Sequence, residues 1–306
     1  MGVRWQHLRE GRSGRAYGLL GGSNLGAVVS GEAALVIDAG LDKDAARKLI
    51  RALEGVEARP VALLITHGHA DHFGGAAALL RRAPMPLYAP PFEAHFIEEP
   101  RLEPLFLHGG AAAIRSLQGK FTQARRGAKV TDLLAPGPLE IGPFRVEIVP
   151  LPGHAPRQVG IGWEEVLFCG DALFPQATLD RHPILFCHDL DAWLETLAAF
   201  PALMARYRLV LPGHGEPVEA EEALALAEAN ADRLREIRAR VLEALRVPAS
   251  PEAILAEVAA AYGLDFPSPP FHLLSRVTIL AALTSLERSG EAEPFVVDNR
   301  LLWRRC

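Results

Sequence analysis

Three histidines and an aspartate lie within six positions of one another in the segment VALLITHGHADHFGG, which covers residues 61–75. The apolar residues 61–65 that precede them are typical of a buried β-strand. Imidazole nitrogens and carboxylate oxygens are the ligands that suit divalent zinc, manganese or iron. The pattern therefore predicts a metal site at the end of a strand, with four candidate ligands: His67, His69, Asp71 and His72.

Further ligand-type side chains follow three later apolar runs, each time beside a glycine at which the backbone can turn sharply. These side chains are His154, Asp171 and His214. Strand ends at one edge of a sheet can converge, so we expect the seven donors to form one site. Seven donors are enough for two metals that share one carboxylate. Two metals can hold a bridging hydroxide at neutral pH, and this chemistry predicts hydrolysis.

The elements that must position these side chains alternate between strand and helix in the first part of the chain. A hairpin is predicted over residues 24–38, and helices over 41–53 and 74–82. Residues 84–136 are irregular, as expected of a long insertion over a site. Strands resume over residues 144–148, 166–169 and 209–211.

Helices dominate the last part of the chain, over residues 220–245, 251–262 and 271–288, and a short hairpin that turns at Asp298 and Asn299 follows them. We therefore predict two domains, a catalytic domain over residues 1–219 and a helical C-terminal domain over residues 220–306. The sequence contains no internal repeat and no low-complexity segment.

Composition limits the class of protein. The chain has 306 residues, 49% of them hydrophobic, and 32 basic against 37 acidic residues give a net charge of -5. A globular protein without a chain-wide basic field for a polyanion is expected. The three cysteines fit a reducing compartment, and no apolar run has signal-peptide or membrane-span length. We therefore expect a cytoplasmic protein that acts on a small molecule, without a membrane partner.

Taken together, these motifs resemble those of the metallo-β-lactamase superfamily over roughly residues 24–217. The matching motifs are Asp38 after an early strand, THGHADH at 66–72, PGH at 152–154, GD at 170–171 and PGHG at 212–215. The resemblance implies an α/β (α+β) fold, the αββα sandwich, with the metals on one edge. It implies two divalent metal ions, with zinc favoured over manganese or iron.

The resemblance also implies a role for each candidate ligand. The first metal would be bound by His67, His69 and His154, and the second by Asp71, His72 and His214. Asp171 would bridge them, and Asp71 and Asp171 would be the catalytic carboxylates. Asp38 resembles the family carboxylate that orients the ligand loop. An alternative for Asp38 is the N-cap of the helix that begins near Leu41.

Departures from the family pattern narrow the expected substrate. Antibiotic-hydrolysing members carry a cysteine where this chain has Asp171, and the large nucleases need a longer insertion than the 43 positions between Asp171 and His214. Flavin-linked members replace one of the clustered histidines. The remaining group is the glyoxalase-II-like hydrolases of thioesters, lactones or phosphoesters. Mononuclear iron persulfide dioxygenases, which share this ligand set, remain an alternative.

The C-terminal helices and hairpin resemble a winged helix, as found in a superfamily subgroup that includes a single-strand endoribonuclease. Residues 220–306 carry ten arginines against thirteen acidic residues, a net charge of -3, whereas a nucleic-acid module should have a basic face. A module that packs on the catalytic domain or forms a homodimer is therefore favoured, and the endoribonuclease remains an alternative.

Four further residues lie where the substrate loops of the family fall, and each is a candidate for substrate contact: His108, Arg157, His182 and His188. Arg157 could bind an anionic group of the substrate or pair with a neighbouring carboxylate. Each histidine could instead be an ordinary loop residue. Cys169 and Cys187 are expected to be buried apolar side chains rather than nucleophiles.

Overall fold

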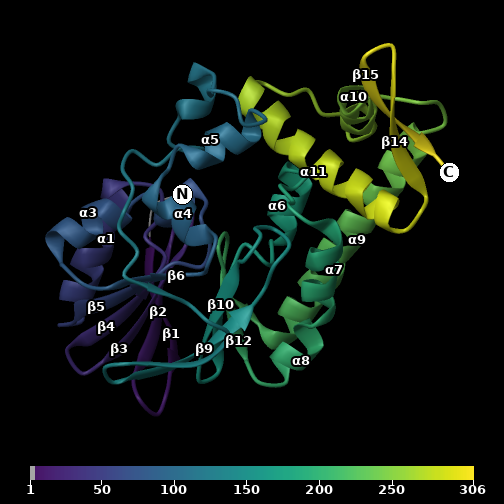
Figure 1. The fold of residues 1–306 in the computed structure, drawn as a ribbon. Helices are drawn as coiled ribbons and strands as arrows, with labels where there is room; N and C mark the ends of the chain where they lie inside the picture. The colour runs from purple at the N-terminus through teal and green to yellow at the C-terminus, as the bar shows by residue number, and fades with distance from the viewer. Residues whose placement is uncertain (1–3) are drawn as a thin grey trace.

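The computed structural model describes residues 4–306, which form two facing β-sheets with helices on both outer faces (Figure 1). Within these residues the first sheet has the order β1-β2-β3-β4-β5-β6-β7. Its strands are β1 (Arg4–Glu10), β2 (Arg15–Leu20), β3 (Leu25–Ser30), β4 (Ala33–Ile37), β5 (Arg59–Leu64), β6 (Leu87–Ala89) and β7 (Asp132–Leu133). Strands β3 and β4 form the predicted antiparallel hairpin, and β5 runs parallel to β4.

The second sheet has the order β13-β12-β11-β10-β9-β8 in the described part of the chain. Its strands are β8 (Gly137–Ile141), β9 (Phe144–Pro150), β10 (Val159–Trp163), β11 (Val166–Gly170), β12 (Leu209–Pro212) and β13 (Val218–Glu219). Strands β9 and β11 both pair antiparallel with β10, and β12 is parallel to β11. The C-terminal ends of β9, β11 and β12 therefore lie at the same edge of the sheet.

The outer face of the first sheet is covered by helices from the first half of the chain. Helix α1 (Lys43–Glu54) buries Ala46, Leu49 and Leu53 against the sheet, at the spacing of one helix face. It packs beside α3 (Ala76–Arg82) and close to β5. The other helical segments here are α2 (Ala70–Phe73), α4 (Glu93–Glu98), α5 (Leu102–Leu107) and the 3₁₀ turn η1 (Arg115–Gln118).

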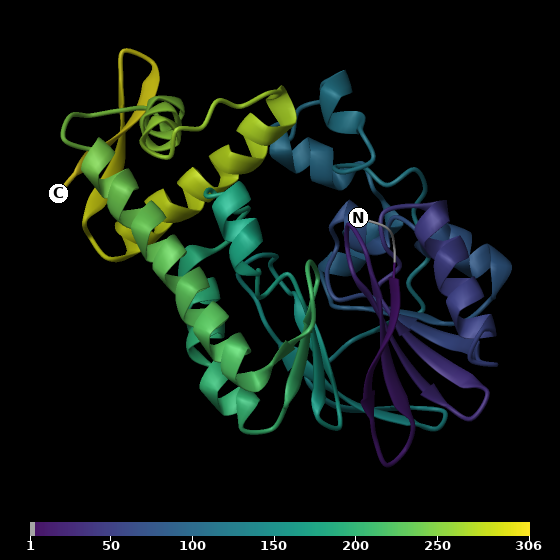
Figure 2. The same cartoon turned by 180° about the vertical axis from the view of Figure 1, so that it is seen from behind.

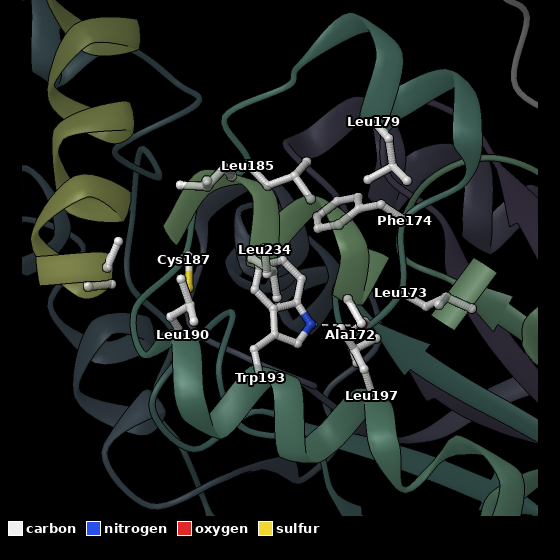
Figure 3. Close-up of a cluster of buried hydrophobic side chains, with 14 of the residues drawn as sticks. Ala172, Leu173, Phe174, Leu179, Leu185, Cys187, Leu190, Trp193, Leu197 and Leu234 are labelled. Carbon is white, nitrogen blue, oxygen red and sulfur yellow. Dashed lines mark hydrogen bonds between the residues drawn. The ribbon is translucent and has the colours of Figure 1, made fainter. Parts of the chain in front are cut away.

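The second sheet is covered by α6 (Gln176–Arg181), α7 (Leu190–Ala198), α8 (Phe200–Met204) and the long α9 (Ala220–Ala244). Trp193 of α7 lies at the centre of this layer, fully buried among leucines (Figure 3). Its indole N–H donates to the Ala172 carbonyl at 2.9 Å, so the polar end of the ring is satisfied. This contact joins α7 to the loop that follows β11.

The C-terminal part contains α10 (Pro251–Ala261), α11 (Pro269–Arg288) and the hairpin of β14 (Ala292–Val297) and β15 (Arg300–Arg305). The predicted hairpin turn is confirmed, with positive φ angles at Asp298 and Asn299. Both ribbon views show α11 reaching from α9 toward α5, which it contacts (Figures 1 and 2). One hydrophobic cluster joins the second sheet to α9, α10 and α11. The division into two domains at residue 219 stays a prediction.

Several elements differ from the sequence prediction. Strands β1 and β2 were not predicted, because β1 is rich in polar side chains and only partly buried. The insertion over residues 84–136 is not wholly irregular, since it contains α4, α5 and two short strands. The predicted helix over residues 74–82 is present as α3, and the short helix α2, which precedes it, was not predicted. Across residues 4–306, no helix combines the length and apolar character needed to cross a bilayer.

Candidate metal centre

The seven predicted ligand side chains come together at one edge of the sandwich. The segment after β5 carries four of them, two in the loop and two on α2, and the loops after β9, β11 and β12 carry one each. They form three overlapping groups in which the donor atoms lie within 4.8 Å of one another. The groups are His67, His69 and His154; His67, His72 and Asp171; and Asp71, His72 and His214. Asp171 lies between the outer two groups, with Oδ2 3.5 Å from His154 Nε2 and 3.4 Å from His214 Nε2.

Glycine is required at two of the turns that bring these loops together. A Cβ atom on Gly213 would lie 2.0 Å from the Asp171 carboxylate, so only glycine lets the loop after β12 approach it. Gly153 has a φ of 127°, and a Cβ atom there would lie 2.3 Å from the backbone of Trp193. The glycines before His154 and His214 therefore set how closely these loops approach their neighbours.

Hydrogen bonds at Nδ1 fix the orientation of three ligand histidines. Carbonyl and carboxylate oxygens accept, so each of these Nδ1 atoms carries the hydrogen and donates it. The Nε2 atom is then the one directed at the shared centre, and its lone pair can bind a metal when the ring is neutral. The acceptors are the Asp38 carboxylate at 2.8 Å from His72, the Phe186 carbonyl at 3.0 Å from His154 and the Gly22 carbonyl at 2.6 Å from His214.

Three buried polar atoms at this centre have no hydrogen-bond partner within residues 4–306. They are His67 Nε2, His72 Nε2 and Asp171 Oδ1, and their side chains form one of the three groups. His72 Nε2 and Asp171 Oδ1 lie 3.2 Å apart, but both are acceptors when the His72 ring is neutral and carries its hydrogen at Nδ1. An unsatisfied buried polar atom costs about 1–3 kcal/mol, more when it is charged. Nitrogen and carboxylate oxygen donors that point at one place suit a divalent cation. The residues present therefore fit the metal pair that the sequence implies.

Burial keeps one set of imidazoles neutral. It lowers the pKa of His69 to about 3 and that of His154 to about 4, and it holds the pKa of His67 well below its usual range. Neutral imidazole is the form that binds metals, so no proton has to leave these rings at pH 7. His69 and His154 also face each other directly, with His69 Nδ1 3.0 Å from His154 Nε2.

The other set of ligands lies in a field that favours positive charge. Burial opposes protonation of His214, but the Asp171 and Asp71 carboxylates raise its pKa to about 10. The pKa of His72 is also raised, against burial, by Asp171, Asp71 and Asp38. Burial would raise the pKa of Asp71, yet His72 and His214 lower it to about 2. A divalent cation would supply the positive charge that these carboxylates stabilise.

Asp38 holds the first ligand loop from behind. It is buried, with a φ of 59°, a left-handed conformation that is uncommon outside glycine and often marks a functional site. Its carboxylate accepts from the Thr66 backbone N–H at 2.8 Å, the Thr66 hydroxyl at 2.9 Å and His72. The alternative role as a helix cap is wrong, because Asp42 caps α1 by accepting from the N–H groups of Asp44 and Ala45.

Sequence reasoning missed the residues that brace the ligand loops. Ser23 donates its hydroxyl to the Asp71 carbonyl at 2.6 Å. The Asn24 amide donates to the Pro212 carbonyl at 2.9 Å and to the Gly215 carbonyl at 2.8 Å. The β2–β3 turn is thereby fixed to loops about 50 and 190 positions away. Serine and asparagine are ordinary turn residues, so nothing in their local sequence marked this role.

Glu93 was also missed. It is 2% exposed, and its carboxylate accepts from the backbone N–H groups of Gly68 and Arg157, both at 2.9 Å. Burial raises its pKa, and the two hydrogen bonds oppose that rise. The side chain ties the loop that contains His67 and His69 to the segment just after His154. A glutamate in a segment without periodicity gave no sequence signal for such a contact.

The four predicted substrate contacts have different surroundings. The His108 ring bonds with a backbone carbonyl of its own loop. His182 stacks on Phe271, with ring centroids 6.4 Å apart. The side chains of Arg157 and His188 are exposed. Their roles in substrate binding stay predictions.

A cavity of about 440 Å³ opens on Asp71 and His214. It lies between the β2–β3 turn, the N-terminal half of α1 and the insertion at Phe121. Its volume is in the range of small-molecule sites, about 300–1,000 Å³. Among residues 4–306, none of the four predicted substrate contacts lines it. The ligand edge therefore has an adjacent space for a substrate that the sequence did not reveal.

Comparison with known proteins agrees with this geometry. Residues 18–214 match the family model of the metallo-β-lactamase superfamily, and the chain belongs to this superfamily. The predicted family and fold are therefore confirmed. A metallo-β-lactamase family protein from Thermus thermophilus has the same fold, with a TM-score of 0.71 at 20% identity, over 93% of this chain and 94% of that protein.

Several relatives are named hydroxyacylglutathione hydrolase. The protein from Anaeromyxobacter dehalogenans is 36% identical over 144 residues, which are 47% of this chain and 43% of the relative. The protein from Halorhodospira halophila is 31% identical over 234 residues, 75% of this chain and 76% of the relative. The chain thus covers less than half of the length of the first of these relatives.

Proposed function

We propose that the protein is a hydrolase that uses two divalent metal ions, with zinc favoured, to cleave a small ester, thioester, lactone or phosphoester. The observation that carries this proposal is the convergence of seven donors around three buried polar atoms that lack partners. Seven donors are enough for two metals that share one carboxylate.

Each ligand keeps the role that the family pattern implies. His67, His69 and His154 would bind one ion, and Asp71, His72 and His214 the other. Asp171 would bridge, which its position between the groups supports.

The side chains of the site perform separate tasks in this reaction. When bound, two divalent ions supply Lewis acidity for the scissile group and a nucleophile from water at neutral pH. Asp71 is ionised at pH 7, since its pKa is about 2, and its carboxylate can orient water by accepting its hydrogen. Asp38 and the Phe186 and Gly22 carbonyls hold the ligand imidazoles in one tautomer.

Thioesters are the first substrates to test, because several relatives are named for hydrolysis of a hydroxyacylglutathione. Metal content should be measured by elemental mass spectrometry on protein purified without added metal or chelator. The same sample should be assayed with lactoylglutathione, a lactone and a phosphodiester. We expect close to two zinc or manganese ions per chain and turnover of at least one substrate that a chelator abolishes.

Two outcomes would contradict the proposal. One iron per chain, with no uptake of a second metal and oxygen consumption with a persulfide, would identify a mononuclear dioxygenase instead. Two metals per chain without chelator-sensitive turnover of any of the three substrate classes would leave the metals structural. His154→Ala is the matched test variant, with His7→Ala, an exposed histidine of β1 outside the donor groups, as its control.

A further inference from the structure

We infer that the cavity beside the metal centre binds an apolar segment of the substrate that ends in an anionic group, and that Lys48 of α1 binds this anion. The inference rests on the proposed function, because it takes the scissile bond to lie at Asp71 and His214. These two residues line the cavity. It specifies the substrate as an ester or thioester that carries a negative charge apart from the reacting bond.

The walls of the cavity are largely apolar. Leu19 and Leu25 lie at the ends of β2 and β3, Leu41 immediately precedes the N-cap of α1, and Ala45 lies in the first turn of this helix. Ala45 and Lys48 are three positions apart, so they lie on the same face of α1. This face is distinct from the face of α1 that is buried against the sheet, which carries Ala46, Leu49 and Leu53. Helix α1 thus presents a second, cavity-lining face that ends in a lysine.

Phe121 closes the cavity from the insertion. Its side chain is 69% exposed, which is unusual for a phenylalanine in a well-packed protein. Lys120, next to it, pairs with Asp42 at 3.6 Å, and its ammonium lies 5.5 Å from the centre of the Phe121 ring. This ion pair fixes the insertion to the N-terminus of α1. The aromatic ring is thereby held at the cavity, where an apolar substrate segment could cover it.

The charges around the cavity leave Lys48 as the anchor for an anion. Asp44 pairs with Arg47 at 3.2 Å, and Asp42 pairs with Lys120. Asp71 lies 3.4 Å from His214. Lys48 lines the cavity but forms no ion pair in the described part of the chain, residues 4–306. An anionic substrate group would therefore meet, in the wall of a largely apolar cavity, an ammonium that has no ion-pair partner within residues 4–306.

Binding of two matched probes tests the inference without requiring turnover. Hexanamide and adipamate have the same apolar chain and the same amide, and only adipamate ends in a carboxylate. Their Kd values should be measured on metal-loaded protein by ligand-observed NMR titration. We expect adipamate to bind roughly fourfold more tightly, as a partly exposed ion pair allows. Lys48→Gln should remove this preference, and Phe121→Ala should weaken binding of both probes.

Lys43→Gln is the matched control, because Lys43 is an exposed lysine of the same helix that does not line the cavity. It should leave the preference unchanged. Equal binding of the two probes, or a preference that persists in Lys48→Gln, would overturn the inference even in an active enzyme. Parallel assays with the p-nitrophenyl esters of hexanoate and adipate report on the proposed function separately, through turnover that a chelator abolishes.

Discussion

Replacing Asp38 with asparagine should weaken metal binding by the Asp71 group while preserving the fold. The asparagine carbonyl can still accept from the Thr66 backbone N–H, as Asp38 Oδ1 does at 2.8 Å. Its amide nitrogen would then face His72 Nδ1, which now donates to the carboxylate at 2.8 Å. Two donors cannot bond to each other, so His72 would shift its hydrogen to Nε2, the atom directed at the metal.

The size of the effect follows from these contacts. The opposite rotamer of asparagine would leave the buried Thr66 N–H without an acceptor, which costs about 1–3 kcal/mol. Loss of a partner that orients a ligand typically weakens metal binding by about 10–100-fold. At about 1.4 kcal/mol for each factor of ten, the loss at the second metal is about 1.4–2.8 kcal/mol. Asp38→Ala should cost more, because it leaves both donors unpaired.

The assay is a titration of zinc against a chromophoric chelator, with metal content by elemental mass spectrometry. Asp42→Asn is the matched control, since asparagine caps a helix as well as aspartate does. It should bind both metals normally and unfold at nearly the same temperature as the parent. If Asp38→Asn bound two metals with unchanged affinity, Asp38 would not set the tautomer of His72, and the reasoning would be refuted.

Three further perturbations test other parts of the structure. Glu93→Ala should reduce the free energy of unfolding by about 2–4 kcal/mol in urea, because two buried N–H groups lose their acceptor, whereas Glu93→Gln should lose less. Trp193→Ala should cost about 3–5 kcal/mol in the same measurement, since the ring is fully buried; a loss below 1 kcal/mol would contradict this. Chelator-treated protein should lose stability between pH 7 and pH 5. The folded chain holds His67, His69 and His154 neutral, while the same rings of the unfolded chain bind protons below about pH 6.5. The two rings with raised pKa values oppose this trend but are fewer, so a flat profile would argue against it.

Local sequence patterns were sufficient to predict much of the fold. The apolar runs of β5, β11 and β12 are fully or largely buried, and such runs are recognisable without context. Strand β1 has a polar, partly exposed sequence and is held by pairing with β2 at the sheet edge, which no local pattern records. The helices of the insertion are only six residues long, too short for periodicity to show.

The candidate site also has a part that could be predicted from the sequence and a part that could not. The convergence of the seven donors could be predicted because each of them follows an apolar run that is typical of a strand. Strands that run in the same direction end at the same edge of a sheet. The bracing contacts could not be predicted, because they join residues far apart in the chain. Glu93, for example, is 25 positions from Gly68 and 64 from Arg157. These residues come together only when both sheets are assembled. Glu93 and Ser23 therefore acquire their roles through tertiary structure alone.

The metal ligands and the cavity walls belong to different parts of the fold, and this has a consequence for specificity. The ligands follow strands whose positions are fixed by the packing between and behind the two sheets. Lys48 and Phe121 project from a helix face and a loop that contribute little to that packing. Substitutions at these two positions can therefore change which substrates bind without disturbing the metals. Variation of substrate range should accordingly map to α1 and the insertion, while variation of metal content maps to the strand ends.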